Sequence, residues 1–458
     1  MEHISKILII LATASLFFRR GIIKPYTFQP FEVLILLAAG ITIVSMILYG
    51  LTQERREKLA IWLKIFPLLL IFLLLGSING YINYGIDSTI IHATLVDLFF
   101  IITQLLAFLL IIYYGLDTNF RKNLLLAFLV PIIFIPFVFS YQLADRFTFL
   151  ESNNYFWGLH QNYVIFGSLC FITFISIAIR FIYEKIKLVK FSYWLLGTLT
   201  LSIIIWTGAR STWLAIVLAL ITIIFYLGQR IAVNKTKYWT ISLCFALFTA
   251  LISFLILPPH AQVAAMIRVF PQVTNYDTRP AVIKQISLGK ALSSITEHPA
   301  FSIPYQNRGS QIPQALSLFS KNMWGLGTQY HRSSKAIIEH PKIGAERYMI
   351  TGVHNSFFQV GISGGIGALI IYIWLLSQLI ITSWRVKIKN REWLLLIAIN
   401  IGLFAVTFFH GILRDLPWVW IIMSLTFSLP IFNNIKQSQL GKPFSYSSLV
   451  NKNNPQAY

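Results

Sequence analysis

The sequence predicts an all-α polytopic membrane protein with about twelve transmembrane helices and one large, mainly helical loop between the ninth and the tenth. Three observations predict this class. Hydrophobic residues make up 56% of the 458 positions and charged residues 12%, whereas soluble domains carry about 25% charged residues. The mean hydropathy is +0.69. Finally, Lys and Arg alternate between rich and poor connections, so the net charge of +21 indicates a membrane topology and not a nucleic-acid surface.

Apolar runs of roughly 20 residues are long enough to cross the hydrocarbon of a bilayer as helices. The two cysteines, Cys170 and Cys244, both lie inside such runs, which suggests neither a disulfide framework nor a metal-binding knuckle. The predicted spans are Ile4–Phe18, Phe31–Leu51, Leu59–Ile78, Ala93–Leu116, Leu124–Tyr141, Val164–Tyr183, Tyr193–Thr207, Thr212–Leu227, Trp239–Leu257, Asn355–Trp384, Trp393–Leu413 and Pro417–Phe432.

Basic residues concentrate in alternate connections between these spans. By contrast, residues 79–92 hold no Lys or Arg, and residues 143–163 hold only Arg146. Because cytoplasmic loops carry an excess of Lys and Arg, the alternation places the basic connections and both termini in the cytoplasm. The basic connections are "TQERREK" (52–58), "DTNFRKN" (117–123), "EKIKLVK" (184–190), "QRIAVNKTK" (229–237) and "RVKIKNR" (385–391).

The first connection is an exception to this alternation. No small-residue cleavage site follows the first span, and Arg19 and Arg20 come instead, so we interpret Ile4–Phe18 as a span and not as a signal peptide. The topology makes Arg19 to Lys24 external although the segment is basic. The role of Arg19 and Arg20 stays open.

The spans divide the chain into four parts. We expect transmembrane helices one to nine in residues 1–257, a periplasmic loop domain in 258–354 and helices ten to twelve in 355–432. Residues 433–458 are predicted to form a disordered cytoplasmic tail. The loop domain holds ten basic and four acidic residues. Such a cationic outer segment suggests an anionic ligand such as a diphosphate, with anionic lipid headgroups as the alternative.

Two residues at the predicted outer face could carry chemistry. Arg210 lies in "WTGARSTW", between two apolar runs, where a cation is costly and is usually functional or paired. Its guanidinium could hold a diphosphate with two hydrogen bonds, whereas a snorkelling side chain that marks the helix end is the simpler alternative. His354 can accept a proton near neutral pH, and Asn355 can cap the helix that follows. The glycines after Asn355 would let another helix approach closely.

Several motifs of other enzyme classes are absent from the sequence. It contains no Walker loop, no HExxH and no pair of acidic residues of the kind that holds a metal for nucleotide-sugar transfer. Among the acids only Asp97 lies clearly inside a predicted span, whereas proton-coupled transporters usually need buried carboxylates. We therefore expect neither a metal nor a cofactor, and transport is the less favoured reading.

The ordered segments "WTGARSTWLA", "NRGSQIPQALSLFSKNMWGLGTQYH" and "GVHNSFFQVGISGGIGALI" resemble the O-antigen ligase family over roughly Ile203 to Leu376. The resemblance implies a metal-independent, inverting glycosyltransferase in the bacterial inner membrane. Such an enzyme moves a glycan from undecaprenyl diphosphate to a sugar hydroxyl of lipid A–core on the periplasmic side. The implied partners are therefore the lipid-linked donor, the lipid A–core acceptor and membrane lipids, with no nucleic acid.

The resemblance also implies roles for particular residues. His354 would activate the acceptor hydroxyl, and Arg210 would bind the donor diphosphate. The loop arginine that assists it is Arg308 or Arg279, of which Arg308 fits the spacing to the glycine turn better. Asn355, Gly325 and Gly327 would support the site.

Other functions on the same helical plan remain open. An O-antigen or capsule polymerase and a protein O-oligosaccharyltransferase differ from the ligase mainly in their acceptor. A transporter of lipid-linked sugars or polysaccharide belongs to another class and predicts polar residues through the membrane depth of several helices. A scaffold that binds a partner gives no reason for Arg210 and His354 to converge.

Overall fold

The helices of the protein follow its apolar runs. The computed structural model describes residues 1–16, 30–51, 53–85, 88–115, 117–130, 163–230, 235–257, 262, 316, 319–328, 355–385, 391–408, 411, 413 and 416–439, and these residues form no strand. The helices are α1 (Glu2–Ser15), α2 (Pro30–Tyr49), α3 (Gln53–Tyr84), α4 (Ser88–Tyr114), α5 (Thr118–Ala127), α8 (Tyr163–Tyr183), α9 (Lys187–Thr207), α10 (Arg210–Arg230), α11 (Lys235–Leu255), α19 (Ser356–Arg385), α20 (Arg391–Phe408) and α21 (Pro417–Gln439).

Eight stretches of these helices are long and apolar enough to cross a membrane. They are Pro30–Tyr49, Trp62–Asn83, Ile91–Tyr114, Val164–Tyr183, Lys187–Thr207, Arg210–Gly228, Ser356–Trp384 and Arg391–Phe408. Helices α11 and α21 hold shorter apolar stretches, Thr240–Leu255 and Pro417–Leu429. The predicted all-α class is thus confirmed for the described residues, whereas the predicted total of about twelve spans is not.

Two predicted spans differ from the helices found. Helix α1 has 14 residues, which corresponds to about 21 Å, shorter than the hydrocarbon core of about 30 Å. The span predicted from Leu124 to Tyr141 does not form one helix, because α5 starts at Thr118 and ends at Ala127. Turns follow at residues 128–130. The next residue is Pro131, and a proline disfavours helical geometry in the residue before it.

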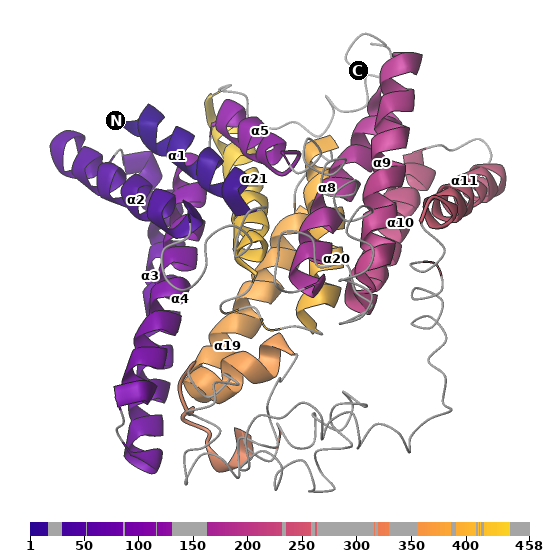
Figure 1. The fold of residues 1–458 in the computed structure, drawn as a ribbon. Helices are drawn as coiled ribbons and strands as arrows, with labels where there is room; N and C mark the ends of the chain where they lie inside the picture. Colours follow the sequence, from indigo (N-terminus) through magenta and orange to yellow (C-terminus); the bar gives the residue numbers. More distant parts are fainter. Residues whose placement is uncertain are drawn as a thin grey trace, which may run out of the picture.

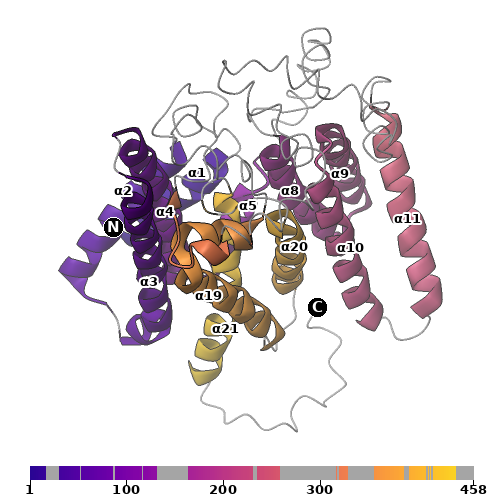
Figure 2. The same ribbon diagram turned by 90° about the horizontal axis from the view of Figure 1, so that it is seen from below.

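The helices form three groups from one side of the bundle to the other (Figures 1 and 2). Helices α2, α3 and α4 lie on one side, and α9, α10 and α11 on the other. Helices α8, α19, α20 and α21 lie between them in both views. The last three helices of the chain therefore lie in the middle of the molecule together with α8.

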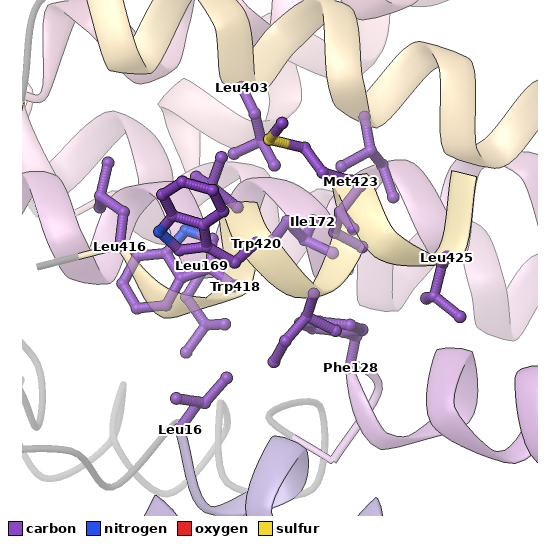
Figure 3. Packing of buried hydrophobic residues seen from close by; sticks show 14 of the residues in the cluster. Leu16, Phe128, Leu169, Ile172, Leu403, Leu416, Trp418, Trp420, Met423 and Leu425 are labelled. Carbon is purple, nitrogen blue, oxygen red and sulfur yellow. The ribbon is translucent and has the colours of Figure 1, made fainter. Parts of the chain in front are cut away.

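Two tryptophans of α21 lie in the apolar core (Figure 3). Trp418 and Trp420 are 0% and 2% exposed. The labelled neighbours come from four other places in the chain, namely Leu16 after α1, Phe128 after α5, Leu169 and Ile172 of α8, and Leu403 of α20. Burial of these large side chains joins the beginning, middle and end of the sequence into one core.

Ion pairs link α1, α5 and α20 at one end of the bundle. Lys6 Nζ lies 2.8 Å from Asp117 Oδ2, and Arg121 Nε lies 2.7 Å from Glu392 Oε1. Partial burial raises the pKa of Asp117. The ammonium of Lys6 and the backbone N–H groups of the first turn of α5 outweigh that effect, and they hold the pKa of Asp117 below its ordinary value.

Aromatic contacts bring the ends of α8 and α10 to the same end of the bundle. The Arg391 guanidinium lies 5.9 Å from the ring centroid of Tyr183 at the end of α8. The rings of Tyr226 in α10 and Trp393 in α20 are 5.2 Å apart. These helix ends therefore lie together. They flank the basic connections predicted at 117–123, 184–190, 229–237 and 385–391. The basic segment from Arg19 to Lys24 lies outside the described residues.

Candidate functional site

Helix α19 begins with the side-chain cap predicted from the sequence. Asn355 Oδ1 accepts hydrogen bonds from the backbone N–H of Phe357 at 2.9 Å and of Phe358 at 3.2 Å. These are N–H groups that have no partner within the helix itself. The Ser356 hydroxyl donates to the carbonyl oxygen of Thr407 near the end of α20. The first turn of α19 is therefore held both by hydrogen bonds within its own helix and by a hydrogen bond to α20.

The turn between α9 and α10 exposes Arg210. Helix α9 ends at Thr207, and Gly208 takes the left-handed conformation with φ 64°, which suits glycine at a helix end. The carbonyl of Ala209 accepts from Thr212 and Trp213, and α10 begins at Arg210. Arg210 is exposed. The local sequence thus presents one cation at the N-terminus of a span.

Helix α20 connects the start of α19 with the start of α10. Ser356 bonds to Thr407, close to the end of α20. A Cβ atom added to Gly402 would lie 2.9 Å from the carbonyl oxygen of Ala215, in the second turn of α10. Arg210 and Asn355 consequently lie at the same end of the bundle, opposite to the end that holds the pair of Arg121 and Glu392.

Helix α19 is broken a third of the way along, at the tenth of its 30 residues. Gly365 has φ 72° and ψ −167°, a backbone region that essentially only glycine occupies. The helix therefore has a first segment, Ser356–Gly364, and a second segment that continues to Arg385 on a different course. Within a membrane such a break leaves backbone groups that need new partners.

A short segment that we name the glycine loop (Met323–Thr328) supplies those partners. The N–H of Leu326 donates to the Ile362 carbonyl at 2.6 Å, and the N–H of Gly327 donates to the Ser363 carbonyl at 2.9 Å. In return the N–H of Ile366 donates to the Met323 carbonyl at 2.8 Å. The coral segment in Figure 1 lies against α19 in both views (Figures 1 and 2). Non-helical backbone at membrane depth is tolerated where it is buried in protein in this way.

Gly325 and Gly327 are required by the conformation of this loop. Their φ angles are 87° and 88°, values that residues with a Cβ rarely adopt. A Cβ added to Gly325 would also lie 2.6 Å from the backbone nitrogen of Gly365. Both glycines thus shape the loop through their backbone conformation, and Gly325 also allows its close approach to α19.

Helix α3 closes the other side of the glycine loop. The Asn79 side-chain amide donates from Nδ2 to the carbonyl oxygen of Gly325 at 2.7 Å. One turn earlier, Gly76 packs directly on the backbone of Ser363 and Gly364, where a Cβ would overlap the Ser363 carbonyl oxygen. Asn79 was missed from the sequence, since the predicted third span ended at Ile78. One feature of the sequence could have indicated Asn79. An amide side chain that directly follows an apolar run usually bonds to another helix or loop.

Two buried hydroxyls near these elements retain hydrogen-bonding capacity. Thr212 lies two residues after Arg210 and is 0% exposed. Thr328 directly follows Gly327 and is 5% exposed. Neither Oγ1 atom has a hydrogen-bond partner, which is uncommon for buried polar atoms. In the described part of the chain, no group of three or more His, Cys, Asp or Glu residues could hold a metal ion.

The structure thus brings together part of the predicted site. Arg210, Asn355, Gly325 and Gly327 belong to elements joined directly or through α20. The other three predicted residues lie outside the described residues, namely His354, Arg308 and Arg279. His354 immediately precedes Asn355 in the chain.

The fold is that of a multi-pass α-helical membrane protein, and its described residues include Arg210 and Asn355 at one end of the bundle. A sequence model of the O-antigen ligase family matches residues 195–373, and this match confirms the resemblance of that region to the family. The family is one of glycosyltransferase-like membrane enzymes. The matched range contains every residue that the sequence predicts for the site. No curated protein gives a significant match to the chain.

Proposed function

We propose that the protein is a ligase that transfers a glycan from undecaprenyl diphosphate to a sugar hydroxyl of lipid A–core at the periplasmic face of the inner membrane. One observation carries the proposal. An exposed Arg210 stands at the end of the bundle where α19 begins, and the residue joined to the capped start of that helix is His354. A cation for a leaving group and a base for a nucleophile thus come from the same end of the molecule.

The proposed reaction has three coupled parts. The acceptor oxygen attacks the anomeric carbon of the donor glycan while the bond from that carbon to the diphosphate oxygen breaks. The acceptor proton passes to a ring nitrogen of His354, and undecaprenyl diphosphate departs. In-line attack inverts the anomeric centre.

Arginines stabilise the leaving group in this proposal. Negative charge grows on the diphosphate as its bond to the sugar breaks, and a guanidinium can balance it with two hydrogen bonds. Arg210 has the position for this role at the exposed start of α10. Arg308, with Arg279 as the alternative, would act from the predicted periplasmic domain. Such preorganised cations act more strongly near lipid than in water.

A transfer assay with purified protein tests the proposal. It uses undecaprenyl diphosphate-linked glycan and lipid A–core, with EDTA present, and compares the parent with His354→Ala. Loss of a general base lowers the rate by about 10²–10⁴-fold, and donor binding should be retained. His92→Ala is a matched control, because His92 is an exposed histidine of α4.

Each outcome of the assay selects one reading. Full transfer by the His354 variant would remove this residue from the mechanism. Donor chains that lengthen in the absence of lipid A–core would indicate a polymerase, and glycan on an added acceptor protein would indicate a protein O-oligosaccharyltransferase. Movement of the donor across vesicles without transfer would favour a transporter, for which the buried carboxylates of Glu32 and Asp97 would then be candidates.

A further inference from the structure

A single side chain joins helix α3 to the glycine loop, although the two are far apart in the sequence. Asn79 in α3 donates from its amide to the carbonyl oxygen of Gly325, at 2.7 Å and 246 positions away. The glycine loop that contains Gly325 makes three backbone hydrogen bonds with α19 at its break. Asn79 thus provides a side-chain hydrogen bond from α3 to a loop that also makes backbone hydrogen bonds with α19.

The first segment of α19 depends on this loop for its position. At Gly365 the helical path is interrupted, so the first segment is not simply carried by the second. The carbonyls of Ile362 and Ser363 accept from the loop, and the backbone of Ser363 rests directly on Gly76. A shift of the glycine loop therefore shifts the last turn of this segment.

The other end of the same segment carries the start of the proposed site. Asn355 lies ten residues before Gly365, about 15 Å along the helix axis. The residues between them form one continuous helical segment. Its first turn is bonded to α20 through Ser356 and Thr407, so a change at Ile362 and Ser363 turns this segment about that bond and reorients Asn355.

We propose that Asn79 is a positioning residue that sets the first segment of α19, and through it His354, relative to Arg210. This proposal rests on the function proposed above. Asn79 touches neither substrate in this scheme and acts through Gly325 and the glycine loop. It predicts that loss of the amide donor lowers the turnover number while substrate binding is kept, since misplacement of a catalytic group by about 1 Å can lower the rate about 10²-fold.

The test compares Asn79→Asp with Asn83→Asp. Both substitutions make the same chemical change on α3, but Asn83 is exposed one turn further along the helix. The introduced carboxylate cannot donate to the Gly325 carbonyl at neutral pH. Asn79→Leu serves as a second variant that removes the donor without adding a charge. In Asn83→Asp, the matched control, both hydrogen exchange and the kinetics of transfer should stay at the parent level.

The first measurement is hydrogen exchange of peptides that cover residues 323–328 and 356–366 in detergent or nanodiscs. We expect exchange about tenfold faster in both Asn79 variants, which corresponds to about 1.4 kcal/mol. For Asn79→Asp the protection should return toward the parent level at a pH below about 4, where the carboxyl is protonated and can donate. Unchanged protection in both variants at neutral pH would overturn the proposal.

The second measurement is steady-state kinetics of glycan transfer. We expect kcat to fall between tenfold and about 10²-fold, with KM for donor and acceptor within about twofold of the parent. Faster exchange with an unchanged kcat would also overturn the positioning role. If the parent itself transfers no glycan, the proposed function fails, whereas the exchange comparison still decides whether Asn79 holds the loop on α19.

Discussion

Gly365 shows how one residue determines a large feature of this molecule. Its φ of 72° and ψ of −167° are essentially restricted to glycine. Its Cα also faces the backbone of the glycine loop, where an added Cβ would lie 2.5 Å from the Met323 carbonyl oxygen and 2.6 Å from the Trp324 carbonyl carbon. The break in α19 and the docking of the loop therefore require the same missing side chain.

Substitution Gly365→Ala should lower stability for both reasons. The backbone strain alone amounts to about 1–3 kcal/mol, and the loop must move away from the new methyl group. We expect a lower unfolding temperature in detergent by scanning fluorimetry. Gly40→Ala is the control, since Gly40 lies exposed in α2 with no atom within 4 Å of an added Cβ. A helical glycine replaced in this way is neutral or gains up to about 1 kcal/mol. Equal unfolding temperatures for the two variants would contradict the interpretation of Gly365.

At the scale of elements, the short helix α5 anchors the start of α20. Arg121 is 1% exposed. It donates from Nε to Glu392 at 2.7 Å and from a terminal guanidinium nitrogen to the Gly115 carbonyl at 2.6 Å. A buried cation needs such partners, because its transfer out of water is costly.

Breaking this pair from one side should be strongly destabilising. Glu392→Gln leaves Arg121 buried with a weaker partner, and removal of one member of a buried pair costs about 3–5 kcal/mol. The double variant Arg121→Met with Glu392→Leu should recover most of that loss. Glu184→Gln is the control, since Glu184 is half-buried outside the core, and an amide oxygen can still accept from the backbone N–H groups of Lys185 and Ile186. Unfolding temperatures of the four proteins check the expectation, and a single variant as stable as the Glu184 control would contradict it.

The elements also differ in how well the sequence predicts them. Long apolar runs locate α4, α8 and α20 because length and hydrophobicity alone decide whether a helix can cross lipid. The cap Asn355 was predicted because it depends on neighbouring residues alone. The break at Gly365 and the role of Asn79 were not predicted. Both depend on contacts between residues more than 35 positions apart, and such contacts leave no periodic pattern in the sequence.

At the scale of the whole molecule, the described elements separate into two ends. One end holds the ion pairs of Lys6 and Arg121, and the other holds Arg210 and Asn355. The predicted distribution of basic connections makes the first end cytoplasmic. The orientation in the membrane remains a prediction.

Labelling of single cysteines tests this orientation. In a Cys244→Ser background, Asn83→Cys places a thiol on α3 near the glycine loop, and Glu184→Cys places one at the opposite end. Cys170 is buried and should not react. In right-side-out vesicles an impermeant maleimide should label the cysteine at 83 and leave the one at 184 unlabelled until the vesicles are opened. The reverse pattern would invert the topology, and equal labelling of both in sealed vesicles would exclude the predicted separation of the two ends.

The docking of the glycine loop limits how this protein can be recombined with others. Residues 258–354 are predicted from the sequence to be one segment between two spans, so exchanging this segment alone would be the simplest design for a chimera. Yet Gly325 accepts a hydrogen bond from Asn79 of α3 on one side, and the glycine loop is bonded to the break in α19 on the other. A chimera would therefore need the parts of α3 and α19 that contact the glycine loop from the same parent as the loop. The residues that must be exchanged together are thus discontinuous in the sequence.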